Sequence, residues 1–161
     1  FRARGEVFGC RRTANRAYEI GNGGQECQNN DLIDSAVVGG NFVALNVRTC
    51  SLYGSSSTVK LVNLRDGRVR FASAPLSTPG SQAGYDAIRG MVLTLGGRLA
   101  WIGVRLTGGR ITSAEVRRRR PDFADQSVVL DSGAGIDPRS LRRRGSRVLW
   151  RNAGVARSVA I

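Results

Sequence analysis

The six residues Gly40-Asn41-Phe42-Val43-Ala44-Leu45 decide the fold, because the 161-residue chain repeats their form twice more. The other copies are Gly96-Gly97-Arg98-Leu99-Ala100-Trp101 and Gly145-Ser146-Arg147-Val148-Leu149-Trp150. Each copy opens with a turn glycine and continues as an apolar stretch, and the copies begin 56 and 49 residues apart. Such a period is typical of a four-stranded repeat unit with loops of variable length. The sequence therefore predicts repeated β-sheet units.

The residues around each copy predict an antiparallel meander, in which strands follow one another through short turns. In the first unit, residues 35–72, Asp66-Gly67 is a strong hairpin turn and residues 59–64 alternate polar and apolar side chains. The second unit, residues 88–131, has glycine pairs at two of its turns. The predicted strands are residues 36–38, 42–47, 59–64 and 68–72 in the first unit, and 91–95, 99–106, 111–116 and 126–131 in the second.

The third unit is predicted to combine both ends of the chain, residues 1–20 and 138–161, within a single domain of residues 1–161. N-terminal strands that complete the last unit are how toroidal repeat folds close. The strands expected here are residues 7–12, 17–20, 140–143, 147–151 and 155–161.

Leu64-Arg65-Asp66-Gly67-Arg68 at the end of a strand, and a Gly-x-x-Val-Ala pattern before a hairpin, resemble repeats of secreted β-propellers. The chain looks like the WD40-like or TolB-type repeat proteins of GC-rich actinobacteria. This resemblance implies an all-β fold of repeated four-stranded antiparallel meanders, propeller-like with about three blades or a partial ring, whereas closed propellers have four to eight. A β-sandwich is the alternative. Trp101 and Trp150 share one register in successive units, so we expect both rings to fill the core between sheets.

The chain is strongly basic, with a formal net charge of +13 and 25 basic residues, among which Lys60 is the only lysine. Arginine suits bidentate contacts to phosphate and carboxylate groups, so one explanation is a polyanionic partner. A GC-rich coding sequence, which replaces lysine with arginine throughout, is the favoured explanation of the ratio of arginine to lysine. The excess of positive charge still requires a role or a neutralising partner.

In the predicted meander, most arginines lie at one end of the strands, and many of the aspartate and glutamate residues lie at the other end. The basic end is expected to bind nucleic acid or an anionic glycan, or to meet the acidic end of a second copy head to tail. Aromatic residues that could stack on bases are missing near the longest arginine run, which disfavours a domain that binds single-stranded nucleic acid. The candidate polyanion- or partner-binding residues are Arg117, Arg118, Arg119, Arg120, Arg142, Arg143 and Arg144.

Three cysteines, Cys10, Cys27 and Cys50, allow three disulfide pairings or only free thiols. In the meander, Cys27 lies in a connection between units and Cys50 in a loop at the same end, whereas Cys10 lies within a strand. We therefore predict a Cys27–Cys50 disulfide with Cys10 free. Such a bridge implies an oxidising compartment, so the expected location is extracellular, secreted or at the cell surface.

The residue types argue against an enzyme, a cofactor or a resident metal. The chain has no histidine, which excludes Ser-His-Asp and Cys-His catalysis and histidine-ligated metals. Asp131, in Leu130-Asp131-Ser132-Gly133-Ala134, resembles the aspartic-protease signature, in which two aspartates share a proton. The competing interpretation is a polar turn, because the residues after Asp131 are already predicted to form strands of the third repeat unit.

The function predicted from the sequence is that of a secreted, non-enzymatic repeat protein that binds a protein partner or assembles with itself. The terminal strands, residues 7–12 and 155–161, are the expected contacts, since unpaired strand edges recruit other chains. The alternative is a polyanion-binding domain that uses the arginine-rich face, and an aspartic-type peptidase through Asp131 comes third. No apolar run is long enough to span a bilayer, so no membrane span is expected.

Overall fold

A computed structural model describes the backbone of residues 2–3, 6–11, 16–22, 31–51, 54–73, 85–119 and 126–161, and the side chains of residues 32–49, 56–73, 87–119 and 126–161. Within these ranges the chain is all β, and no helix occurs. This confirms the prediction of an all-β fold.

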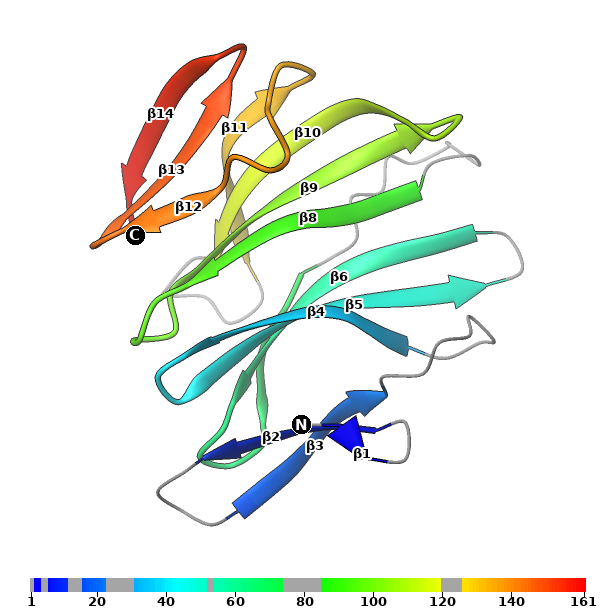
Figure 1. The fold of residues 1–161 in the computed structure, drawn as a ribbon, viewed down its shortest axis with the longest axis vertical. Coiled ribbons are helices and arrows are strands. Elements are labelled where there is room, and N and C mark those ends of the chain that lie inside the picture. Colours follow the sequence, from blue (N-terminus) through cyan, green and yellow to red (C-terminus); the bar gives the residue numbers. More distant parts are fainter. Residues whose placement is uncertain are drawn as a thin grey trace.

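The strands form three sheets (Figure 1). Sheet A contains β1 (Arg2–Ala3), β2 (Glu6–Arg11), β3 (Arg16–Asn22), β4 (Asp31–Gly39), β5 (Phe42–Ser51), β6 (Gly54–Asn63) and β7 (Val69–Ala72), in chain order. Sheet B has the order β11-β10-β9-β8, from β8 (Tyr85–Leu93), β9 (Leu99–Thr107), β10 (Arg110–Arg119) and β11 (Ser127–Gly133). Sheet C consists of β12 (Arg142–Arg144), β13 (Arg147–Asn152) and β14 (Val155–Ala160).

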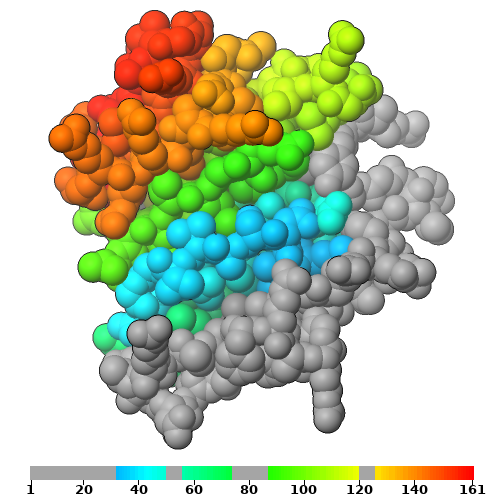
Figure 2. Space-filling view, viewed as in Figure 1, coloured from blue at the N-terminus to red at the C-terminus, as the bar shows by residue number. Residues whose placement is uncertain are grey.

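Sheet B lies between sheets A and C, and the three appear as successive bands on the surface (Figures 1 and 2). β9 is therefore buried on both faces. Its alternate residues Leu99 and Trp101 pack with Phe71 and other side chains of sheet A. Ala100 and Ile102 point the opposite way and belong to the cluster shared with sheet C. Alternation along one central strand thus joins both interfaces.

The repeated hexapeptides take the same orientation in all three sheets. Their fourth and sixth residues face the preceding part of the stack: Leu99 and Trp101 pack on sheet A, and Val148 and Trp150 pack on sheet B. In sheet A, the equivalent Val43 and Leu45 lie in a third buried cluster, on the face away from sheet B. The expectation that both tryptophans fill the core between sheets is confirmed, since Trp101 is 1% exposed and Trp150 is 5% exposed.

The fifth residue of each hexapeptide points in the other direction, toward the following sheet. Ala44 packs in the cluster shared with sheet B, and Ala100 packs in the cluster shared with sheet C. Leu149 is the equivalent residue of sheet C, is half-buried, and has no described sheet beyond it. Sheet C consequently ends the described stack with one face uncovered.

A close backbone approach joins sheets A and B at the β4–β5 turn. Gly40 has φ +59, and a Cβ built there would lie 2.4 Å from the carbonyl oxygen of Leu95 in the β8–β9 turn. Only glycine suits both the left-handed backbone and the missing space. The first glycine of the repeat therefore brings two neighbouring turns together.

The predicted strand plan of the first two units is confirmed, because β4–β7 and β8–β11 are each four antiparallel strands. The third unit differs from its prediction. β2 and β3 form the expected hairpin, yet they join sheet A through a single parallel pair, Asn22 with Leu32, rather than sheet C. Strands that are neighbours in the chain usually become neighbours in a sheet, and this preference decided the pairing. No closed ring is present in the described part of the chain.

Candidate anion-binding surface

The seven arginines predicted as a binding site lie on two different sheets. Arg117, Arg118 and Arg119 are the last residues of β10 in sheet B, and Arg142–Arg144 make up the whole of β12 in sheet C. Arg120 lies outside the described residues. The predicted strand at residues 140–143 is observed as a short strand at Arg142–Arg144, whose three residues are all exposed.

The strand register of sheet C places four arginines on its uncovered face. Arg142 pairs with Leu149, and Arg144 pairs with Arg147. Paired residues of an antiparallel sheet share a face, as do residues two apart in a strand. The face that carries Leu149 therefore also carries a set that we call the outer arginine face: Arg142, Arg144, Arg147 and Arg151.

Small side chains fill the third strand of this face. Leu149 pairs with Ser158, Arg147 with Ala160 and Arg151 with Ala156. No aromatic residue belongs to this set, and the short neighbours leave the guanidinium groups accessible. The outer arginine face is consequently a basic surface that extends from β12 to β14, and a pocket opens on it beside Arg142, Leu149 and Arg151.

Serine, rather than a carboxylate, orients the central arginine of the face. The Nη2 and Nε atoms of Arg147 donate to the Ser158 hydroxyl at 2.7 and 3.2 Å. Arg142, Arg144 and Arg151 make no side-chain hydrogen bond or ion pair with any residue that the structure describes. The four positive charges of the face are therefore not neutralised within the described chain.

Four of the described carboxylates, those of Asp34, Asp66, Glu115 and Asp131, have partners away from the outer arginine face, whereas Asp137 lines a pocket with Arg142 and Arg151 but forms no ion pair with them. Asp34 pairs with Arg48 at 2.9 Å, and Glu115 pairs with the Nε atom of Arg117 at 2.6 Å. Arg117 also donates to Ser127 at 3.0 Å, so this member of the predicted site is held by its own sheet. Local pairing of this kind weakens the idea of an acidic face that meets a basic one.

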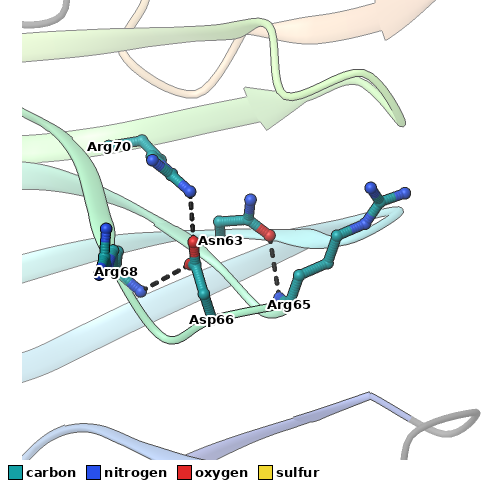
Figure 3. A network of polar contacts seen from close by, with 5 residues as sticks. All are labelled: Asn63, Arg65, Asp66, Arg68 and Arg70. Atoms are coloured by element: carbon teal, nitrogen blue, oxygen red, sulfur yellow. Dashed lines mark hydrogen bonds and ion pairs between the residues drawn. The ribbon is translucent and has the colours of Figure 1, made fainter.

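The β6–β7 turn shows the same local neutralisation (Figure 3). One carboxylate oxygen of Asp66 accepts a hydrogen bond from the backbone N–H of Arg68 at 3.0 Å, and the other pairs with Arg70. Asn63 accepts from the backbone N–H of Arg65 at 2.9 Å. The turn predicted from Asp66-Gly67 is confirmed, and its aspartate is used to close it.

Asp131 links sheets B and C. Its carboxylate accepts the indole N–H of Trp150 at 2.6 Å and the side-chain amide of Asn152 at 3.0 and 3.1 Å. It also accepts the backbone N–H of Ser132 at 2.9 Å. The residue singled out as a possible catalytic aspartate therefore bonds three neighbouring groups in the structure.

Two members of the outer arginine face, Arg147 and Arg151, were missed by the sequence prediction, which followed runs of consecutive arginines. The alternation of residues 147–151 carries the missing signal, since every second residue of a strand shares a face. Side chains at Cys10, Cys27 and Cys50 lie outside the described ones, so the predicted disulfide stays a prediction. The backbone places Cys50 in β5 rather than in a loop.

Clusters of three or more histidine, cysteine, aspartate or glutamate side chains that suit a metal ion are absent from the described part of the chain. Across the same residues, no helix has the length and apolar character needed to cross a membrane. In comparisons with protein-family models, with curated proteins and with solved structures, nothing matches this chain.

Proposed function

We propose that this chain is a non-enzymatic, extracellular binding module that holds an anionic polysaccharide on the outer arginine face. The observation that carries the proposal is the grouping of Arg142, Arg144, Arg147 and Arg151 on one sheet face without a described carboxylate partner. Neighbouring strands are about 4.8 Å apart, so the four charges are close enough to contact successive anionic groups of one polymer.

The chemistry of the face favours recognition by charge. Guanidinium groups bind sulfate, phosphate and carboxylate oxygens in bidentate geometry. Bases of single-stranded nucleic acids bind by stacking on aromatic rings, and this face has none. A polysaccharide that carries repeated anionic groups is therefore the better fit, and nucleic acid is the competing outcome of the test.

The test is heparin binding measured at several salt concentrations. Replacing Arg142 and Arg144 by serine should weaken binding and lower the salt dependence, because fewer counterions are released. The matched control replaces the exposed arginines Arg68 and Arg110, which removes the same charge from other places. Equal losses in both double variants mean that net charge alone is responsible, and stronger binding to DNA than to heparin favours the nucleic-acid alternative.

Self-assembly is the second candidate, and the edge of sheet C favours it. β14 pairs only with β13, so its other edge is open in the described structure. An open edge can accept a strand from another copy. The repeated orientation of the sheets is also compatible with a partial propeller-like ring. Light scattering across a wide concentration range tests this candidate, and a monomer at every concentration contradicts it.

A further inference from the structure

A second basic site lies apart from the outer arginine face, where the ends of sheets B and C meet. A cavity of about 200 Å³ opens between the β8–β9 turn, the end of β10 and the residue that follows β14. Three arginines line it: Arg98, Arg118 and Arg119. Three positive charges around one small volume repel each other unless an anion lies among them.

Two of these guanidinium groups have a buried N–H without an acceptor. The Nε atoms of Arg118 and Arg119 are both inaccessible and have no hydrogen-bond partner among the described residues. Arg118 is nevertheless held in place, because its Nη1 atom donates to the carbonyl oxygen of Ala160 at 3.0 Å. These two Nε atoms cannot be reached from the cavity, so the Nη groups are the donors that its arginines offer to a ligand.

The remaining walls of the cavity suit a compact ligand. Leu99 is 1% exposed and Ile161 is 7% exposed, so the cavity has an apolar side, where a charge-assisted hydrogen bond is stronger than in open water. Gly96 and Gly97 also line the cavity and contribute no side chains to it. The volume is below the range of pockets that take drug-sized ligands, which favours a single small group.

We propose that this cavity binds one tetrahedral oxyanion, a phosphate or sulfate group, beside the three arginines that line it. The group is either free in solution or carried by a larger molecule. The site does not depend on the outer arginine face, and its residues differ from those of that face.

Isothermal titration calorimetry with inorganic phosphate, and separately with sulfate, tests the site in a chloride buffer. We expect saturable binding by the full chain and at least tenfold weaker binding after Arg118→Met or Arg119→Met, which keep most of the apolar stem. Arg142→Met on the outer arginine face is the matched control and should leave phosphate binding unchanged. Equal weakening in the control overturns the proposal, whereas loss of heparin binding in that control alone concerns only the proposed function.

A third variant distinguishes a loss of binding from a loss of folding. Arg98 is exposed and lies in a turn, so Arg98→Met should fold normally and still weaken phosphate binding. The unfolding temperature of each variant, measured without phosphate, shows whether it folds. Normal folding with undiminished phosphate binding in all three variants overturns the proposal.

Two further arms concern what occupies the cavity. Asp122 and Asp125 follow β10 in the chain, outside the described residues. If phosphate binds only after both are changed to asparagine, an internal carboxylate fills the cavity and the proposal of an open ligand site is overturned. If the unaltered chain binds phosphate, competition with a heparin oligosaccharide identifies the source: displacement indicates a group carried by a polymer, and independent binding indicates a free ion. Both results support the site.

Discussion

Trp150 of sheet C donates its indole N–H to the carboxylate of Asp131 in sheet B, with 2.6 Å between Nε1 and Oδ2. The ring itself is buried in the apolar cluster that the two sheets share. One side chain therefore supplies both apolar contact and a charge-assisted hydrogen bond across the interface, and Asn152 adds a second donor to the same carboxylate.

Removing this carboxylate should destabilise the packing of sheet C. Asp131→Ala leaves the buried indole N–H of Trp150 without its acceptor, and we expect a loss of about 1–3 kcal/mol in the free energy of unfolding. Urea denaturation followed by tryptophan fluorescence measures it. Asp137→Ala is the control and should cost less, because among the described residues the Asp137 carboxylate bonds only the nearby backbone N–H of Arg139. Equal costs for both variants contradict the role of Asp131 as an inter-sheet link.

Two adjacent residues of β13 report which face of sheet C is covered. Val148 is fully buried against sheet B, and Leu149 is half-buried on the outer arginine face. Val148→Ala should lower the free energy of unfolding by about 1–2 kcal/mol, because it removes buried methyl groups and leaves a cavity. Leu149→Ala should lower the free energy of unfolding by less than Val148→Ala does, because Leu149 is only half-buried, even though this substitution removes more atoms. A larger cost for Leu149→Ala, growing with protein concentration, indicates that a second copy covers this face.

Neighbouring glycines in the β8–β9 turn should respond in opposite directions to alanine. Gly97 has φ +79, and a Cβ there would lie 2.9 Å from the Phe42 ring, so Gly97→Ala should cost about 1–3 kcal/mol. At Gly96 the nearest atom to a new Cβ is 4.0 Å away and φ is not positive, so Gly96→Ala should gain up to about 1 kcal/mol. Thermal denaturation measures both. Similar shifts of the same sign count against the described contact between sheets A and B.

The β13–β14 turn contains a strained alanine. Ala153 has φ +50, the left-handed region that disfavours a side chain. Ala153→Gly should therefore raise the free energy of unfolding by about 0.5–1 kcal/mol. Ala156→Gly, within the extended strand β14, is the control and should lower it by a similar amount. A loss at both positions shows that the flexibility of glycine, rather than relief of strain, dominates in this turn.

Most of the strand plan could be predicted from the sequence, because its causes are local. Alternating side chains and turn residues depend on neighbours within a few positions, as at Asp66-Gly67, and they predicted the two central meanders. The same periodicity placed Trp101 and Trp150 correctly in the core. The partner sheet of the N-terminal hairpin was predicted incorrectly, since residues 7–20 match either place in the local pattern and only the pairing of Asn22 with Leu32 distinguishes them.

The chain by itself determined that it would be a basic, all-β repeat with an apolar stripe on each central strand. Tertiary structure alone decided which arginines remain available. Arg48 of β5 is paired with Asp34 of the neighbouring strand β4, whereas Arg142 and Arg144 join Arg147 and Arg151 on an uncovered face. The physical reason is that the net charge follows from the residue types alone, whereas the pairing of each charge depends on which side chains become neighbours when the chain folds. Contacts between residues far apart in the chain, such as the cavity shared by Arg98 and Arg118, exist only once the sheets have packed.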